Sequence, residues 1–211
     1  MSWITPTLIF LFFCISHSYL AEASVKEWVF SKAPKIRPFY RIFYSLFSVL
    51  LLCLWIYFLP NDSTLIYSFP GMAKWFLLAI NLSSFIFLIY ILLKFNLGVF
   101  IGTRQVKDFL KFKKRPEYLD EPEKGTLITL GLHKYVRHPI YTFSMLVLIT
   151  NPAPTVREAY FSVCVILYFY IGSYFEEKKL IQRFGEEYKS YQKKTGRFFP
   201  SIIKFSTFGN G

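Results

Sequence analysis

Long apolar runs constrain the fold of this chain more than any other feature of its sequence. A membrane-spanning helix needs roughly 20 consecutive apolar residues, with a range of about 17 to 25. Only 18% of the residues are charged, whereas about a quarter are charged in a typical soluble domain. The sequence therefore predicts an all-α polytopic membrane protein. The runs long enough to span a bilayer are Ile4–Leu20, Ile42–Leu59, Trp75–Phe95 and Ala159–Phe175.

A fifth apolar run, Ile140–Ile149, is too short to cross a bilayer unaided. Asn151-Pro152-Ala153-Pro154 follows it directly and leads into the last long run. We expect the short run, extended by less apolar residues, to form a helical hairpin with Ala159–Phe175. The expected fold is a bundle of about five transmembrane helices. No linker or repeat divides the sequence, so we expect one integral membrane domain over residues 1–211.

The first apolar run has a competing interpretation as a cleaved signal peptide. Ala21-Glu22-Ala23 resembles an A-x-A cleavage site. However, no Lys or Arg precedes the run, and a signal peptide begins with a positively charged region. We therefore expect Ile4–Leu20 to remain as a spanning helix.

The placement of basic residues predicts the orientation in the membrane. Of the 25 Lys and Arg residues, five lie between the first two runs, ten lie from Lys94 to Arg137, and eight follow Glu177. Only Lys74 and Arg157 fall in the other loops, so five crossings place 23 of the 25 on one side. Cytoplasmic loops are rich in Lys and Arg. The sequence predicts an outside N-terminus and a cytoplasmic C-terminus and cofactor pocket; if the protein is bacterial, the membrane would be the inner or plasma membrane.

Several partners and site types are excluded by the sequence. The net charge of +12 resides in loops between apolar runs, where lipid headgroups rather than nucleic acid would meet it. The three cysteines lie far apart inside apolar runs, so neither a disulfide nor a metal site is expected. The chain has no G-x-G-x-x-G, Walker, H-E-x-x-H or G-x-S-x-G motif. An active site would have to be built at the membrane surface.

An anion site at the start of a helix is predicted by one short segment, Arg137-His138-Pro139-Ile140-Tyr141. Pro139 disfavours the helical conformation at His138 and suits the first position of a helix. The free N–H groups and the positive end of the helix dipole attract an anion there. Arg137 would add a positive charge beside this helix end. A basic interfacial loop that binds no ligand would account for the same residues.

Glu176 and Glu177 are expected at the end of the last apolar helix, where acidic residues at a membrane boundary are candidates for function. They can accept from a cationic group or from sugar hydroxyls. Together with the predicted anion site they supply the groups that bind S-adenosylmethionine, which carries a carboxylate, a sulfonium and an adenine. The aromatic residues that can hold the adenine are Tyr135, Tyr141, Tyr170 and Tyr174.

These motifs resemble the isoprenylcysteine carboxyl methyltransferase and phospholipid methyltransferase superfamily. The resemblance rests on residues 135–141, Glu176-Glu177, residues 184–191 (F-G-E-E-Y-K-S-Y) and Phe199-Pro200. It covers roughly residues 98–200, which we expect to form the cofactor-binding part. The resemblance implies an S-adenosylmethionine-dependent methyltransferase with a cytoplasmic cofactor pocket.

The same resemblance implies roles for individual residues. The cofactor-binding residues would be His138, Tyr141, Glu176 and Glu177, to which Tyr135 is added as an adenine contact. Arg137 and His138 would be the catalytic residues, with Arg137 at the cofactor carboxylate or at the acceptor.

Within that superfamily, the sequence is most similar to the bacterial methanethiol S-methyltransferase-like branch. The similarity rests on two short segments, His17-Ser18 and Gly102-Thr103-Arg104-Gln105. This similarity implies a small thiol as acceptor, with His17 and Arg104 as substrate residues and a basic environment that favours the thiolate. His17 can equally be a polar residue that packs helices together. An isoprenylcysteine carboxylate and a phospholipid amine are also possible acceptors. Two functions without catalysis stay open as well: a non-catalytic membrane protein of the same fold, and a lipid-binding protein that uses only its basic face.

Overall fold

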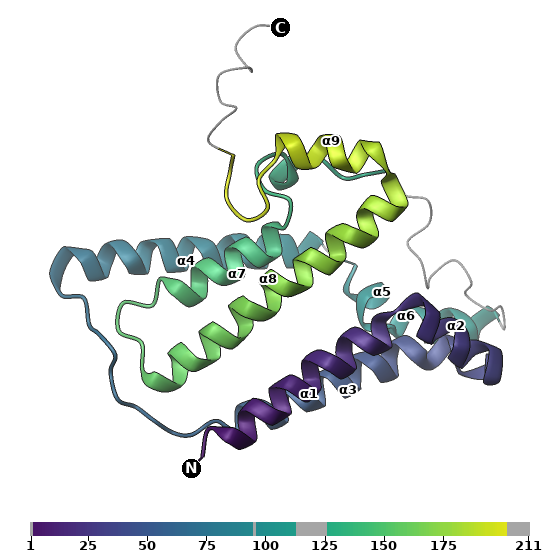
Figure 1. Cartoon of the computed structure of the whole chain (residues 1–211), viewed down its shortest axis with the longest axis horizontal. Helices are drawn as coiled ribbons and strands as arrows, with labels where there is room; N and C mark the ends of the chain where they lie inside the picture. The colour runs from purple at the N-terminus through teal and green to yellow at the C-terminus, as the bar shows by residue number, and fades with distance from the viewer. Residues whose placement is uncertain (1, 95, 113–125, 202–211) are drawn as a thin grey trace, which may run out of the picture. The chain divides into compact units, whose positions relative to one another are not determined.

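The computed structural model describes residues 2–94, 96–112 and 126–201 (Figure 1). Helices dominate these residues, and the only extended pairings among them are two isolated bridges, Leu65 with Thr155 and Val136 with Gly196. The all-helical class predicted from the sequence is therefore confirmed. Contacts between Cα atoms divide the described residues into two compact units that alternate along the chain. Each unit is described by itself.

The first unit comprises residues 2–62 and 92–112. Its core is an antiparallel pair of long helices, α1 and α3, which lie side by side (Figure 1). The Phe10 and Trp55 rings are 4.4 Å apart, and His17 lies near the other end of the pair beside Ser48. The helices of this unit are α1 (Ile4–Ala21), α2 (Ala23–Lys32), the 3₁₀ helix η1 (Pro34–Ile36), α3 (Arg37–Phe58), α5 (Leu97–Ile101) and α6 (Thr103–Phe112).

Gly102 joins α5 to α6 and packs directly against the backbone of α3. Its φ is +103°, a conformation that only glycine adopts easily. A Cβ atom at this position would lie 2.6 Å from the Ile42 nitrogen and 2.9 Å from the Arg41 carbonyl carbon. Gln105 is fully buried one turn later, and its Nε2 donates to the Val99 carbonyl at 3.0 Å. The turn at Gly102 thus fixes α5 and α6 on the start of α3.

The second unit comprises residues 63–91 and 126–201, so it includes most of α4. In it α7 packs between α4 and α8. The Phe87 and Phe143 rings stack at 5.0 Å, and the Tyr141 and Phe169 rings stack at 4.7 Å. Asn81 of α4 donates to the Val147 carbonyl at 2.7 Å, near the end of α7. The helices are α4 (Gly71–Lys94), the 3₁₀ helix η3 (Gly131–Lys134), α7 (Pro139–Ile149), α8 (Val156–Phe184) and α9 (Glu186–Lys194).

The connection between α7 and α8 pairs with the residues that precede α4. Backbone N–H groups of Ile66 and Phe69 donate to the carbonyls of Pro154 and Pro152, at 3.0 and 2.9 Å. Thr155 caps the start of α8, where its side chain and that of Glu158 bond to each other's backbone N–H in a capping box. The start of α4 and the start of α8 therefore lie at the same end of this unit.

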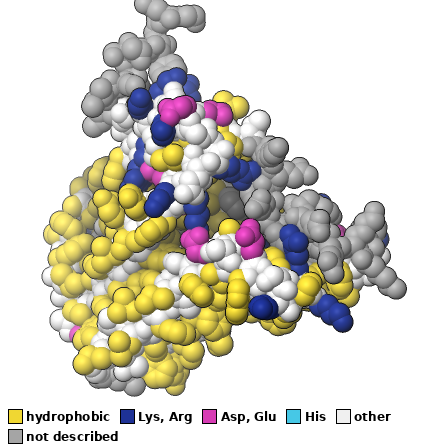
Figure 2. All heavy atoms as spheres, turned by 45° about the vertical axis from the view of Figure 1, so that its right-hand side comes forward, with side chains coloured by type: hydrophobic (Ala, Val, Ile, Leu, Met, Phe, Trp, Pro, Cys, Tyr) yellow, Lys and Arg dark blue, Asp and Glu magenta, His cyan; other side chains and the backbone are white. Residues whose placement is uncertain are grey.

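Four helical stretches are long and apolar enough to span a membrane: Ile4–Ala21, Pro34–Phe58, Gly71–Lys94 and Val156–Phe184. They match the four long apolar runs of the sequence, except that Leu59 follows the end of α3 and Phe95 lies outside the described residues. The chain is accordingly a multi-pass membrane protein. Little of each span is buried within the protein. Large areas of hydrophobic side chains consequently cover the surface in Figure 2, as a bilayer requires.

The expectation that the last apolar helix ends at Glu176 and Glu177 is wrong. α8 continues for about two more turns, to Phe184, and ends where Gly185 adopts a φ of +57°. Residues 178–184 (K-K-L-I-Q-R-F) are rich in good helix formers, so the helix persists after the apolar run has stopped. The two glutamates therefore lie within a helix rather than at its negative end.

Candidate active site

Arg137, His138 and Pro139 lie where η3 gives way to α7. His138 is the residue before the helix, with φ −122° and ψ 69°, and Pro139 is the first helical residue. The predicted effect of Pro139 on His138 is therefore confirmed. The Thr142 hydroxyl, in the first turn, donates to the His138 carbonyl at 3.0 Å. This junction brings the Arg137 and His138 side chains towards α8.

A buried carboxylate, Glu177, is the centre of the cluster that results. Its side chain is only 3% exposed, and it accepts hydrogen bonds from two arginines, a histidine and a glutamine. Two guanidinium groups at hydrogen-bonding distance stabilise the ionised form of a carboxylate. The donors are Arg137 Nε at 2.7 Å, His138 Nε2 at 3.1 Å, Arg197 Nη2 at 2.9 Å and Gln192 Nε2 at 2.9 Å.

The neighbouring carboxylate, Glu176, is in a different environment. Its side chain is 48% exposed, and it accepts from the Tyr141 hydroxyl at 3.0 Å. Tyr141 in turn lies between two rings, stacked on His138 at 5.4 Å and on Phe169 at 4.7 Å. Adjacent positions in one helix thus give one buried glutamate and one that a ligand can reach.

Both ring nitrogens of His138 face a carboxylate. Nε2 lies 3.1 Å from Glu177 and Nδ1 lies 3.5 Å from Glu176. Burial alone would lower the pKa of His138, but its hydrogen bonds to the two carboxylates and their negative charges outweigh burial and raise the pKa. In the protonated ring both nitrogens are donors, which is the form that this pair of acceptors requires.

The raised pKa of His138 predicts a pH dependence of stability. A group whose folded pKa exceeds its unfolded value of 6.5 contributes stability that is complete below pH 6.5 and is lost as the pH rises through the folded pKa. We expect the Tm difference between the wild type and His138→Gln to be largest below pH 6.5 and to shrink above it. Thermal unfolding of both proteins in detergent across this range measures the difference. A difference that grows with pH would contradict the assignment.

The C-terminal segment (residues 195–198) runs beside the junction and is bonded to it through the backbone. The Arg137 side chain adds to this pairing, since its Nη1 donates to the carbonyls of Gln192 and Thr195. The segment therefore forms part of the cluster, bonded both to the junction and, through Arg197, to Glu177 of α8. The remaining bonds run from the Arg137 N–H to Gly196 O (2.9 Å), from the His138 N–H to Arg197 O (3.2 Å) and from the Thr142 hydroxyl to Phe198 O (2.9 Å).

Two buried tyrosines of α9 hold the segment in place. Tyr188 and Tyr191 lie three residues apart on one face of the helix and are 1% and 8% exposed. The Tyr191 hydroxyl donates to the His133 carbonyl in η3. Burial raises the pKa of Tyr191 to about 12, so the hydroxyl remains a donor at neutral pH. The F-G-x-x-Y-x-x-Y pattern thus corresponds to a turn at Gly185 followed by a helix that packs on η3.

The structure brings together five of the predicted site residues: Arg137, His138, Tyr141, Glu176 and Glu177. The side chain of Tyr135, two residues before Arg137, is half-exposed, and within the described residues its hydroxyl makes no hydrogen bond. The remaining two predicted residues, His17 and Arg104, belong to the first unit.

His17 connects α1 to α3 through both ring nitrogens. Nδ1 lies 2.9 Å from the Ser48 hydroxyl and Nε2 lies 2.7 Å from the Tyr44 hydroxyl. The Ser48 hydroxyl donates to the Tyr44 carbonyl at 2.8 Å, so it accepts from His17 Nδ1–H, and Nε2 accepts from Tyr44. This arrangement favours the interpretation of His17 as a helix-packing residue. Arg104 lies on α6, with its Nε 3.7 Å from Asp108.

Gln192 and Arg197 were not predicted from the sequence, although both bind Glu177. Their separations of 15 and 20 residues from Glu177 match no helical or strand period. The only signal was that both lie in the tail whose motif also supplies Tyr188 and Tyr191. A buried carboxylate requires partners, and this requirement becomes visible only when its burial is known.

Comparison with known proteins adds relatives over most of the chain. Residues 27–195 match the family described as "Protein of unknown function (DUF1295)". The chain is 30% identical over 207 residues to a methanethiol S-methyltransferase of Pseudomonas deceptionensis, covering 96% of this chain and 74% of that one. It is also 30% identical to one of Crocosphaera subtropica, over 92% of this chain and 73% of that one. It is 28% identical to methanethiol S-methyltransferase 1 of Bradyrhizobium diazoefficiens, over 92% of this chain and 65% of that one. No solved structure matches. These findings confirm the resemblance predicted from the motifs.

Proposed function

Because this chain belongs to the DUF1295 family and to that of the methanethiol S-methyltransferases, we propose that it is a membrane methyltransferase that transfers a methyl group from S-adenosylmethionine to a small thiol. The observation that carries the proposal is the cluster around Glu177, in which a reachable carboxylate, a histidine that faces two carboxylates and an aromatic stack meet. The cofactor-binding part is residues 98–200 of a single domain in this proposal.

The groups of the cluster fit the chemistry of the cofactor. With His138 protonated, the three cations Arg137, His138 and Arg197 exceed the two carboxylates by one positive charge, which suits the cofactor's carboxylate. Glu176 is exposed enough to accept from its ammonium group or ribose hydroxyls. The exposed ring of Tyr135, two residues before Arg137, offers an aromatic surface to its adenine.

The residues of the cluster divide into two groups by their exposure and contacts. We assign cofactor contact to Tyr141 and Glu176, which are partly exposed, and to His138, whose side chain is only 6% exposed but faces both of them. Glu177 and Arg137 are positioning residues, because the two side chains are 3% and 10% exposed and bond to each other. Arg137 would then act on the reaction by holding the C-terminal segment and Glu177 in place.

The cofactor supplies an activated methyl group, whose sulfonium leaves as a neutral thioether. The protein therefore has to hold the acceptor in line and exclude water, which can contribute up to roughly 7–11 kcal/mol. The acceptor must lose its proton, and an unperturbed thiol has a pKa near 8.5. A site with net positive charge increases the thiolate fraction, so the proton can pass to solvent water as the thiol enters, and neither His17 nor His138 has to act as a base.

We also propose five crossings, with α7 and its flanking residues as the fourth. α7 has 11 residues and is about 16 Å long, too short for a bilayer core of about 30 Å. It runs antiparallel to α4, however, and the residues after it pair with those before α4. The N-terminus would be outside, and the C-terminus and the cluster cytoplasmic. Topology reporters fused after Ser63 and after Phe199 should report opposite sides; the same side at both would exclude this count.

Methyl transfer from labelled donor tests the proposed reaction. The purified full chain in detergent is given methanethiol, a farnesylcysteine analogue and phosphatidylethanolamine in one mixture. We expect label in the thioether, and at least a tenfold lower rate for His138→Ala, since roughly 1.4 kcal/mol of lost binding or positioning is tenfold. Label in the prenylated carboxylate or in the lipid would contradict the thiol acceptor. Absence of both transfer and adenosylmethionine binding by calorimetry, in folded wild type, would remove the enzyme assignment.

A further inference from the structure

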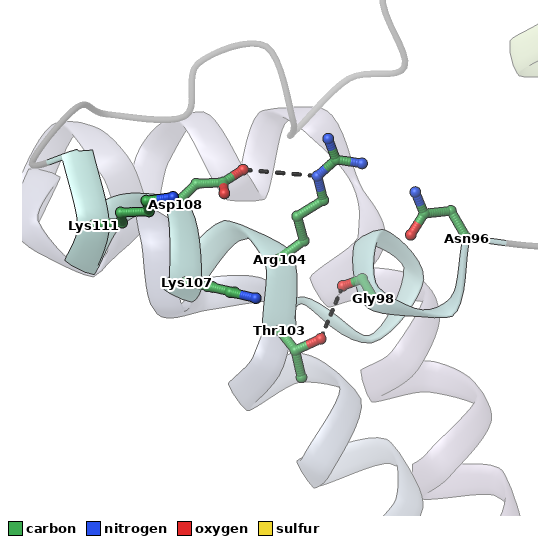
Figure 3. Close-up of a pocket in the computed structure, with 7 residues that line it drawn as sticks. All are labelled: Asn96, Gly98, Thr103, Arg104, Lys107, Asp108 and Lys111. Atoms are coloured by element: carbon green, nitrogen blue, oxygen red, sulfur yellow. Dashed lines mark hydrogen bonds and ion pairs between the residues drawn. The ribbon is translucent and has the colours of Figure 1, made fainter.

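A second polar site lies in the first unit, which contains none of the residues assigned above to cofactor contact. An open cavity of about 450 Å³ is formed between the residues around α5 and one side of α6 (Figure 3). Three basic side chains reach it from α6, at Arg104, Lys107 and Lys111. Their spacing of three and four residues places them on one face of the helix. Asp108 also lines the cavity, so the lining carries three cations and one carboxylate.

The other polar groups of the cavity are hydrogen-bond donors or orient the cations. Asn96 uses its Oδ1 to accept from the Val99 N–H at 3.3 Å, which leaves its amide N–H₂ as a donor. Asp108 lies 3.7 Å from Arg104 and restrains the guanidinium group, whose side chain is 54% exposed. Figure 3 shows Asn96 on the segment before α5, apart from the side chains of Arg104, Lys107, Asp108 and Lys111 along α6. The lining therefore matches a ligand with several anionic oxygens.

The residues that line the cavity adjoin the ends of two candidate membrane spans. α6 packs on the first turns of α3, where the Phe39 and Phe109 rings are 5.7 Å apart, and α3 is a candidate span. α5 begins at Leu97, three residues after the candidate span α4 ends. In a bilayer that these two spans cross, the lipid phosphates would be expected near the ends of the spans and so near the cavity. Leu110, 69% exposed on the same helix, adds apolar surface for an acyl chain.

We propose that this cavity binds the headgroup of an anionic phospholipid with free hydroxyls, such as phosphatidylglycerol. The phosphate would lie among Arg104, Lys107 and Lys111, and the Asp108 carboxylate would accept from a headgroup hydroxyl. A phosphate near basic side chains at a membrane surface gains about 1 kcal/mol per cation. Arg104 is then a lipid contact rather than a residue that binds the methyl acceptor. The proposal does not depend on the methyltransferase assignment.

Lipid-dependent thermal stability tests the proposal. The purified full chain in neutral detergent is titrated with dioleoylphosphatidylglycerol, dioleoylphosphatidylcholine or glycerol 1-phosphate, and the rise in Tm gives an apparent affinity. Phosphatidylglycerol should stabilise the wild type. Lys107→Gln should weaken its apparent affinity about fivefold and Lys107→Gln with Lys111→Gln about 25-fold, the factors that correspond to about 1 kcal/mol per cation. Both side chains are exposed, so the variants should fold as the wild type does.

The matched control is Lys35→Gln, which removes an exposed cation of the same unit that does not line the cavity. Its apparent affinity for phosphatidylglycerol should change less than twofold, a difference below about 0.4 kcal/mol. An equal loss for Lys35→Gln would mean that general surface charge attracts the lipid, and would overturn the proposal. Equal stabilisation by phosphatidylcholine would overturn headgroup recognition. Equal stabilisation by glycerol 1-phosphate would show a soluble phosphate site instead of a lipid site.

Discussion

Glu177→Gln should destabilise the protein by about 3 kcal/mol or more, because removal of one partner from a buried ion pair leaves uncompensated charge. The variant keeps the shape of the side chain but removes the negative charge that faces Arg137, Arg197 and His138. For a chain of about this size the loss corresponds to a fall in Tm of roughly 6–12 °C. Thermal unfolding in detergent, followed by circular dichroism, measures it.

Glu176→Gln is the matched control for that variant. It makes the same substitution at the adjacent position, where the side chain is half-exposed and bonds to Tyr141. We expect the Tm to change little, since exposed ion pairs contribute about 0–1 kcal/mol, while calorimetric affinity for adenosylmethionine falls. Equal destabilisation by the two variants would contradict the distinction between a buried positioning residue and a reachable contact.

Gly102→Ala should also be strongly destabilising, by about 3 kcal/mol. A positive φ costs a residue with a Cβ about 1–2 kcal/mol, and the new methyl group would overlap the backbone of α3 at Ile42 and Arg41. Overpacking of this kind costs about 1–3 kcal/mol, and backbone atoms cannot move aside as a flexible side chain does. The free energy of unfolding in detergent, from titration with a denaturing surfactant, is the quantity to compare.

Gly131→Ala separates the two contributions. Gly131 also has a positive φ, +65°, but a Cβ atom there would have nothing within 4 Å. The free energy of unfolding of Gly131→Ala should therefore fall only by the cost of the positive φ, about 1–2 kcal/mol. If Gly102→Ala were no worse than Gly131→Ala, the close packing of α5 and α6 on α3 would not be a source of stability.

The long helices and the start of α7 could be predicted from the sequence because their causes are local. An apolar run of about 17 residues or more specifies a spanning helix by itself, as for Trp75–Phe95, which corresponds to α4. Pro139 likewise restricts the backbone of its own neighbour, so the helix start at His138 needed no tertiary information.

The features that were missed depend on contacts between distant residues or on short amphipathic segments. α2, α5, α6 and α9 are short helices of 5 to 10 residues, and isolated helices of that length are only marginally stable without packing partners. The burial of Glu177 depends on Gln192 and Arg197, which come from beyond the turn at Gly185. The sequence pointed to the glutamate pair but not to the different environments of its two members.

The pairing of residues 195–198 with the junction before α7 has a consequence for biosynthesis. The groups around Glu177 come from three stretches that emerge from the ribosome at different times, and the last of them follows the final candidate span. Gln192 and Arg197 can contact Glu177 only after they have been synthesised and have folded back beside it. Until then, Arg137 and His138 are the partners available to this glutamate from the earlier stretches. The complete cluster therefore cannot form before the last of the three stretches has folded back.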